Sequence, residues 1–238
     1  MRVNWLDLTG INIRTMESRI ALVFGSTGLI GNLLLGELVS SDRYSVIKSF
    51  VRQPTGVTET KVEEIITDFS DLSVISEKIT GDDLYICLGT TIRKAGSVAQ
   101  MEKVDRDLPL VIAAAALANG IMNVAVVSSI GASSRSSNYY LRIKGEMEEG
   151  IMKLDFENIS IVRPSMLLGE RKEKRAGEIV GKAVMKAFRP MLVGKFSRYR
   201  AIHGGDVARA MISLSLGPDG RRIAESDELQ KIADSYKS

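Results

Sequence analysis

Short apolar runs alternate with longer, mixed segments over the first two thirds of the chain. The runs have the length of buried strands and cover residues 19–24, 46–51, 62–67, 84–88, 122–127 and 159–162. The segments between them show helical spacing of apolar residues over 28–39, 71–79, 97–118 and 139–154, with Pro109 expected to kink the third. Strands that alternate with helices predict an α/β fold, a doubly wound parallel sheet covered on both faces.

The pattern changes after residue 164. A charged loop at 170–175 is followed by helical segments at 177–188, 206–216 and 226–236, with Asp206 and Ser226 at the starts of the last two. We therefore expect a single domain over 1–238, with a dinucleotide-binding core at 19–164 and a small C-terminal lobe at 165–238 over the strand ends. Residues 1–18 fall outside the pattern, either as a short arm anchored by Trp5 or as a segment upstream of a start at Met16.

The first apolar run enters a turn that contains three glycines, Gly25, Gly28 and Gly31, before the first helical segment. Gly25 would allow a tight turn, Gly28 a close approach to a phosphate, and Gly31 close packing of helix on strand. The N–H groups at the start of that helix and its dipole would bind a pyrophosphate. The spacing is G-x-x-G-x-x-G, and an ordinary glycine-rich loop is the alternative reading.

Polar or small residues follow the second and fourth apolar runs, at the strand ends where parallel sheets bind their ligands. Arg52 ends the second, and an arginine there suits the 2′-phosphate of NADP, whereas NAD is usually read by an acid. A solvated strand-end arginine is the alternative. Gly89, Thr90 and Thr91 end the fourth run, and their small size leaves room for a ribose, although an ordinary turn has the same composition.

Tyr140 and Lys144 are four residues apart in a helical segment and therefore share one face of it. A neighbouring ammonium favours the phenolate form of a tyrosine, and a phenol tuned in this way can exchange a proton with a carbonyl or alcohol. Ser129 follows the preceding strand and could donate a hydrogen bond to the substrate oxygen. By itself, this spacing is also found where a tyrosine and a lysine lie on the surface of a helix without a catalytic role.

Composition and charge narrow the class of protein. The net charge of +3, with interspersed acids and bases, predicts neither a nucleic-acid nor a membrane partner, and no apolar run is long enough to span a bilayer. The single cysteine, Cys87, permits no intrachain disulfide, so we expect a cytoplasmic protein. One cysteine and one histidine are too few for a structural zinc site, and no metal is expected.

Taken together, these motifs resemble the short-chain dehydrogenase/reductase family, in its atypical, Tat-interacting oxidoreductase-like branch. The resemblance covers residues 19–216 and rests on five segments: FGSTGLIG at 24–31, CLGTT at 87–91, SSIGA at 128–132, YLRIK at 140–144 and VRPSMLLG at 162–169. The run CLGTTIRKAG and the VDRD at 104–107 are similar to that branch in particular. The resemblance implies a Rossmann fold that binds a dinucleotide, NADPH in preference to NAD.

The resemblance also implies roles for individual residues. It assigns the pyrophosphate turn to Gly25, Ser26, Thr27, Gly28, Leu29, Ile30 and Gly31. It assigns the 2′-phosphate to Arg52, adenine to Asp68 and Phe69, the ribose to Leu88, Gly89, Thr90 and Lys144, and a further cofactor contact to Pro164. It assigns catalysis to Ser129, Tyr140 and Lys144, with Ser128 as an alternative serine. One departure is Val104-Asp105, where the family often has an asparagine in its proton relay.

Three functions are compatible with these residues. The first is an NADP-dependent oxidoreductase for a small carbonyl or alcohol. The second is a regulator controlled by NADPH occupancy, and the third is a nucleotide-sugar epimerase, for which little chain remains after Pro164. We expect a small-molecule substrate and either a monomer or a homodimer.

Overall fold

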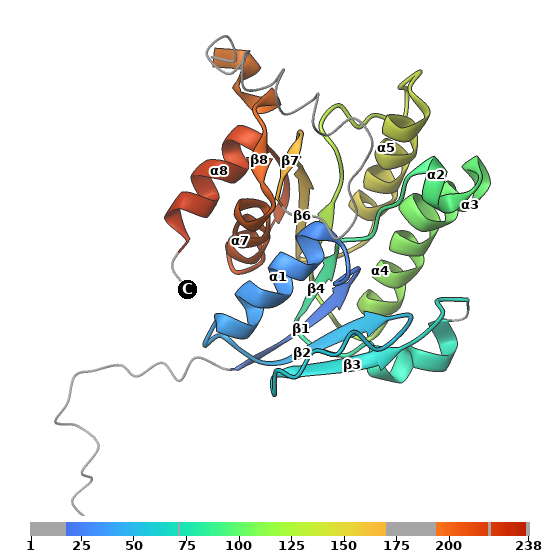
Figure 1. Cartoon of the computed structure of the whole chain (residues 1–238), viewed down its shortest axis with the longest axis vertical. Helices are drawn as coiled ribbons and strands as arrows, with labels where there is room; N and C mark the ends of the chain where they lie inside the picture. Colours follow the sequence, from blue (N-terminus) through green and yellow to red (C-terminus); the bar gives the residue numbers. More distant parts are fainter. Residues whose placement is uncertain (1–17, 71, 170–193, 219, 237–238) are drawn as a thin grey trace, which may run out of the picture.

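The computed structural model describes residues 18–70, 72–169, 194–218 and 220–236 of the chain (Figure 1). The N-terminal arm, the charged loop at 170–175 and the helix expected at 177–188 lie outside the described residues, apart from residue 18 of the arm.

Seven strands form one parallel sheet with the order β3-β2-β1-β4-β5-β6-β9. The strands are β1 (Arg19–Phe24), β2 (Tyr44–Val51), β3 (Val62–Ile66), β4 (Asp83–Ile86), β5 (Asn123–Val127), β6 (Asn158–Arg163) and β9 (Gly220–Glu225). The six predicted strands are all present, and the prediction of a doubly wound α/β fold is confirmed.

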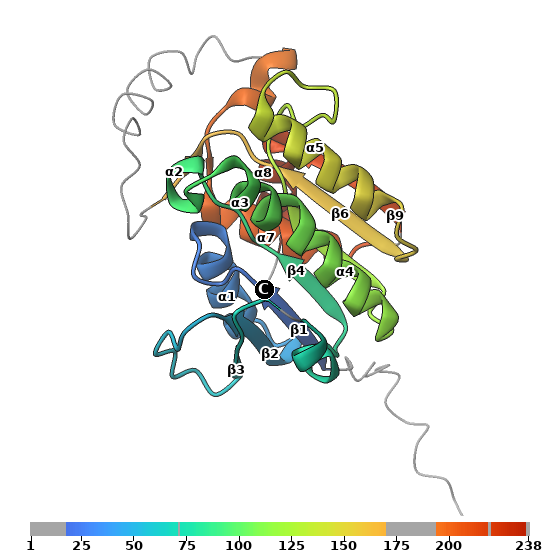
Figure 2. The same ribbon diagram turned by 90° about the vertical axis from the view of Figure 1, so that its right-hand side faces the viewer.

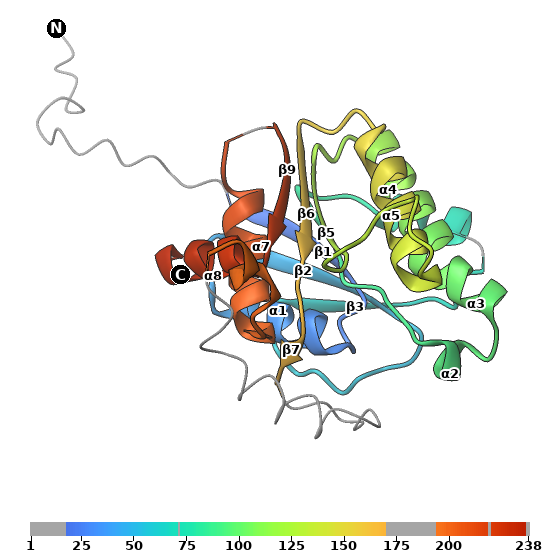
Figure 3. The same cartoon turned by 90° about the horizontal axis from the view of Figure 1, so that it is seen from above.

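Helices cover both faces of the sheet (Figure 3). One face carries α1 (Leu29–Ser40), α7 (Gly204–Ser215) and α8 (Ser226–Ser235), whereas the other carries the 3₁₀ helix η1 (Leu72–Lys78), α4 (Leu108–Ala118) and α5 (Tyr139–Met152). The second face is turned toward the viewer in Figure 2. Successive residues of β1 belong to different cores: Val23 packs under α1 and α7, and Leu22 packs on the other face. This two-sided burial explains why the strands read as continuous apolar runs.

The helix predicted over 97–118 consists of three pieces. They are α3 (Val98–Glu102), a π-helical turn, η2 (Lys103–Asp107), and α4, which has Pro109 in its first turn. A proline has no N–H to donate, so the regular hydrogen-bond ladder cannot continue through this position. The π turn stands just before the proline and places Asp105 inward, fully buried. A short helix, α2 (Ile92–Ala95), precedes α3.

The C-terminal third differs from the prediction in two ways. β9 was not predicted, because it contributes an edge strand with four exposed residues and no apolar run. It pairs with β6, so part of the expected C-terminal lobe belongs to the sheet. Helix α7 begins at Gly204, and its cap is His203 rather than Asp206, since His203 Nδ1 accepts a hydrogen bond from Gly205 N at 3.1 Å.

Three small elements lie between β6 and α7. They are β7 (Leu167–Leu168), the 3₁₀ helix η4 (Gly194–Tyr199) and β8 (Ile202–His203), and β7 pairs with β8 in a separate two-stranded sheet.

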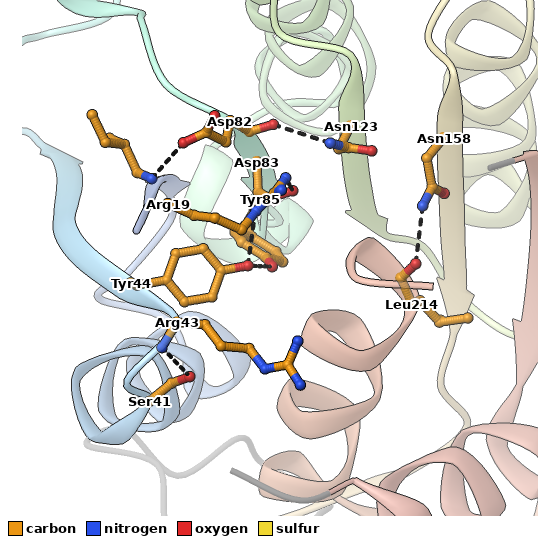
Figure 4. A network of polar contacts seen from close by, with 11 residues as sticks. Arg19, Ser41, Arg43, Tyr44, Asp82, Asp83, Tyr85, Asn123, Asn158 and Leu214 are labelled. Carbon is orange, nitrogen blue, oxygen red and sulfur yellow. Dashed lines mark hydrogen bonds and ion pairs between the residues drawn. The ribbon is translucent and has the colours of Figure 1, made fainter. Parts of the chain in front are cut away.

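The amino-terminal edge of the sheet is closed by polar contacts between the first residues of neighbouring strands (Figure 4). Arg19 donates two hydrogen bonds to Asp83, at 2.6 and 2.7 Å, and Tyr44 donates to the same carboxylate at 2.8 Å. Tyr44 also lies 2.9 Å from the Tyr85 hydroxyl. Burial raises the pKa of Asp83, and the neighbouring Arg19 guanidinium opposes this shift. These contacts pair the polar groups at the amino-terminal ends of β1, β2 and β4 with one another.

Two glycines of α1 provide a test of how tightly this helix packs. A Cβ at Gly31 would lie 2.1 Å from the Gly25 carbonyl oxygen, whereas a Cβ at the exposed Gly36 would meet no atom within 4 Å. We expect Gly31→Ala to lower the free energy of unfolding by about 1–3 kcal/mol through overpacking. Gly36→Ala, five positions later on the same helix, should raise it by about 0.4–1 kcal/mol by restricting the unfolded chain. Urea unfolding of both variants checks this pair, and equal effects would contradict the packing described.

Candidate functional site

The glycine turn between β1 and α1 is fixed by close contacts with β4. Gly25 has a φ of +91°, and a Cβ there would lie 2.7 Å from the carbonyl carbon and oxygen of Cys87. At Gly28, by contrast, a Cβ would meet nothing nearer than 3.3 Å, and Thr27 and Gly28 are exposed. The start of α1 has no side-chain cap and no acidic residue in its first turn. Its N–H groups are therefore available to an anion, and the turn fits a bound pyrophosphate.

Ser26 contributes to this turn through its backbone only. Its side chain is buried, and the Ser49 hydroxyl of β2 donates a hydrogen bond to it at 2.8 Å. Ile30 and Gly31 are also buried, whereas Leu29 is half-buried beside Gly169 and Gly204.

The residues expected at the adenosine end follow β2 and β3. Arg52 is exposed and makes no hydrogen bond or ion pair with another described residue. Asp68 is exposed, and hydrogen bonds from the Ser70 hydroxyl and amide lower its pKa. The Phe69 ring lies 6.1 Å from the Phe24 ring at the end of β1. The structure thus leaves one unpaired cation, Arg52, at the carboxyl end of β2.

Lys144 is the buried centre of the site, with a side chain that is 2% exposed. Its Nζ donates to the carbonyl oxygens of Leu88 and Val127, each at 3.4 Å, and lies 3.0 Å from Asp105 Oδ1. Because Leu88 follows β4 and Val127 ends β5, the ammonium links the ends of two adjacent strands to α5. Burial raises the pKa of the Cys87 thiol to about 12 against the opposing charge of Lys144, so this cysteine stays protonated at neutral pH.

Asp105 is a site residue that the sequence indicated only as a departure from the family pattern. Its side chain is fully buried, and Oδ2 accepts a hydrogen bond from Thr90 N at 3.0 Å. The residue therefore joins Lys144 to the segment Leu88–Thr90, where the ribose was expected. The signal in the sequence was a charged residue, Asp105, shortly before the apolar helix α4.

The two adjacent tyrosines at the start of α5 have different partners. The Tyr139 hydroxyl donates to Glu102 Oε1 of α3 at 2.5 Å, and this hydrogen bond raises the pKa of Tyr139. Tyr140 makes no side-chain hydrogen bond to any other described residue. Of the two phenols, only the one on the Lys144 face is therefore available to a ligand.

The two serines after β5 also differ. Ser128 is buried and donates its proton to Glu148 Oε1 at 2.5 Å, and Glu148 is held in turn by Arg163 at 2.9 and 2.5 Å. Ser129 is half-buried, and its hydroxyl has only a 3.5 Å contact with the carbonyl oxygen of Ile130. The Ser129 hydroxyl is therefore available to a ligand, whereas the hydroxyl of Ser128, the alternative serine, donates to Glu148.

Two further residues complete this edge. The buried Pro164, after β6, accepts a hydrogen bond from Ile130 N at 3.1 Å, which holds the loop beside Ser129. Glu148 was missed by the sequence reasoning, although it follows Lys144 by one turn on the same helix face.

Comparisons with known proteins show the family to which the chain belongs. Residues 25–214 match the family model described as NAD(P)H-binding. Protein FMP52, mitochondrial, of Eremothecium gossypii is 32% identical over 89% of this chain and 96% of its own length. Protein HTATIP2 of Rattus norvegicus is 32% identical over 85% of this chain and 84% of its own. The solved structure of MoeE5 in complex with UDP-glucose and NAD has a TM-score of 0.65 at 16% identity, over 90% and 80% of the two chains.

The expected cytoplasmic location is wrong by this comparison. The FMP52 relatives from Eremothecium gossypii, Saccharomyces cerevisiae and Candida albicans are named mitochondrial. One cysteine in the sequence does not separate these two compartments. In the part of the chain that the structure describes, no helix combines the length and apolar character that crossing a bilayer requires.

The buried contact between Glu148 and Arg163 generates a stability prediction. The Glu148 and Arg163 side chains are 5% and 20% exposed, so Glu148→Ala would leave a largely buried guanidinium without its carboxylate. We expect the free energy of unfolding to fall by about 3 kcal/mol. The control is Glu149→Ala, which removes the exposed neighbour bonded to Ser134 and should change stability by less than about 1 kcal/mol. Similar losses for both variants, measured by urea unfolding, would refute the role given to Glu148.

Proposed function

This chain belongs to the NAD(P)H-binding family, and we propose that within it the protein is an NADPH-dependent oxidoreductase that interconverts a small carbonyl compound and its alcohol. The proposal rests first on one observation: a free phenol, Tyr140, lies one helical turn from a buried ammonium, Lys144, at the open edge of the sheet. When bound, NADPH supplies a hydride to the carbonyl carbon.

The remaining chemistry belongs to the protein. Tyr140 donates its phenolic proton to the carbonyl oxygen as the alcohol forms, and its location on α5 suits this role because no protein group competes for the hydroxyl. Ser129 donates a hydrogen bond to the same oxygen. Lys144 binds the nicotinamide ribose, and its positive charge stabilises the phenolate that remains.

The preference for NADPH rests on Arg52. The side chain is exposed, follows β2 and has no anionic partner among the described residues, so it can bind the 2′-phosphate of the cofactor. The glycine turn would hold the pyrophosphate on the N–H groups of α1.

A specific observation supports a second candidate. Asp105 balances the charge of Lys144, so the ammonium stabilises a phenolate at Tyr140 less, which slows proton transfer without removing the groups proposed to bind the dinucleotide. In that case the protein is an NADPH-binding regulator. The resemblance to an NAD- and UDP-glucose-bound structure concerns the fold alone, so it adds no weight to a nucleotide-sugar epimerase.

Arg52→Ala tests the choice of cofactor. The variant should bind NADPH at least about tenfold more weakly, because a charge-assisted hydrogen bond to phosphate is lost, and should bind NADH as the wild type does. Isothermal titration calorimetry measures both. Arg222→Ala is the control, because Arg222 is an exposed arginine on β9, at the far side of the sheet from β2. Equal weakening of NADPH and NADH would refute the assignment of Arg52.

Tyr140→Phe tests the chemistry. On any aldehyde or ketone accepted by the wild type, the variant should lose at least about 10²-fold in turnover while NADPH stays bound. Tyr139→Phe is the matched control and should retain activity, since Tyr139 is held by Glu102. The assay follows NADPH oxidation over a screen of small carbonyl compounds. Full activity of Tyr140→Phe would exclude the mechanism, and tight NADPH binding without turnover of any substrate would favour the regulator.

A further inference from the structure

The carboxylate of Asp105 has one oxygen that the protein does not satisfy. Oδ2 accepts a hydrogen bond from Thr90 N at 3.0 Å, but Oδ1 receives no hydrogen bond from a described residue, although it is fully buried. Lys144 Nζ lies 3.0 Å from it, in an ion pair without hydrogen-bond alignment. Buried carboxylate oxygens normally accept a hydrogen bond, so this one is suited to a donor that arrives with a ligand.

Gly89 is an exposed residue that stands beside this buried oxygen. A Cβ at Gly89 would lie 3.4 Å from Asp105 Oδ1 and 3.9 Å from Lys144 Nζ, so with glycine here no side chain of residue 89 stands between the exposed segment and these two buried atoms. Gly89 is itself exposed and does not have a positive φ. Since the backbone does not require glycine at this position, the missing side chain has its effect through the space that it leaves.

An acceptor and a donor therefore stand side by side, 3.0 Å apart, beneath a position that has no side chain. A hydroxyl group is the ligand chemistry that fits this pair, because one hydroxyl both donates and accepts a hydrogen bond. A vicinal diol fits it better still, since its two oxygens can contact both groups. A carboxylate or phosphate ligand would be repelled by Asp105, and an ammonium by Lys144.

We propose that Asp105 is a cofactor-binding residue whose Oδ1 accepts a hydrogen bond from a hydroxyl of the nicotinamide ribose, while Lys144 Nζ donates to the same sugar. The inference rests on the proposed function, which puts that ribose at Lys144. Before the cofactor binds, Asp105 balances the charge of the buried ammonium, and Thr90 N holds the carboxylate in place. When it binds, the ribose hydroxyl completes the hydrogen bonding of Oδ1.

The experiment compares two ligands on the full chain by isothermal titration calorimetry. NADPH carries both riboses, whereas 2′,5′-ADP shares the adenosine half and lacks the nicotinamide ribose. In Asp105→Asn the remaining oxygen would accept from Thr90 N, and the amide NH₂ would face the hydroxyl and the ammonium with no acceptor. We expect NADPH to bind at least about tenfold more weakly to this variant, as for a lost hydrogen bond to a charged group, and 2′,5′-ADP to bind unchanged.

Glu102→Gln is the matched control. Glu102 is an acidic residue three positions before Asp105, and it holds Tyr139 rather than Lys144. This variant should bind both ligands as the wild type does. NADPH binding to Asp105→Asn that is equal to or tighter than wild type would overturn the proposal, and so would an equal loss of both ligands.

A second variant tests the same space with the ion pair intact. Gly89→Ala places a methyl group over Asp105 Oδ1 and should weaken NADPH while leaving 2′,5′-ADP unchanged, even if Asp105→Asn does not fold. Unchanged NADPH binding to Gly89→Ala would overturn the proposal. If neither ligand binds to the wild-type protein, the proposed cofactor is wrong, and the proposed function fails with it. If both ligands bind to the wild type and the variants bind NADPH equally well, only the role given to Asp105 is wrong.

Discussion

The buried ammonium of Lys144 is the interaction on which this site depends. A cation that is removed from water needs acceptors on all sides, and here the carbonyl groups after β4 and at the end of β5, with Asp105 from the π turn, provide them. Three parts of the chain that are distant in sequence are therefore brought to one point. The same point lies beside the segment Leu88–Thr90 and one helical turn from Tyr140, so the contact that stabilises this edge also arranges its chemistry.

The two edges of the sheet have opposite properties because all its strands are parallel. The amino-terminal edge is closed by side chains that bond to one another, as in the contact of Arg19 with Asp83 and Tyr44. The carboxyl-terminal edge is lined by glycines and by polar groups that have no hydrogen-bond partner among the described residues, such as the N–H groups at the start of α1 and the hydroxyl of Tyr140. The unpaired polar groups are the reason that we expect the cofactor at the carboxyl-terminal edge.

The sequence predicts the parts of this structure that depend on local pattern. The six strands buried on both faces are visible as apolar runs, and the helix start after Gly28 follows from the glycine turn. β9 could not be found in this way, because an exposed edge strand needs no apolar run. The capping of α7 by His203 was also missed, since a histidine cap has no strong sequence signal.

The candidate site also has a part that local sequence pattern predicts and a part that it does not. The spacing of Tyr140 and Lys144 is local and can be read directly, whereas the pairing of Lys144 with Asp105 joins residues 39 positions apart through a π turn that no simple periodicity predicts. The choice between Ser128 and Ser129 likewise required the position of Glu148. Contacts across elements, rather than within one, are what the sequence alone does not determine.

Hydrogen–deuterium exchange of the full chain, with and without NADPH, shows whether the cofactor binds along the carboxyl-terminal edge of the sheet. If the dinucleotide binds along the carboxyl-terminal edge, amides in the glycine turn at 25–31, in the segment 88–91 and at the start of α5 should exchange more slowly with the cofactor present. Those of β9 and α8 should be unchanged. Protection confined to other segments, or no protection at saturating NADPH, would contradict the account.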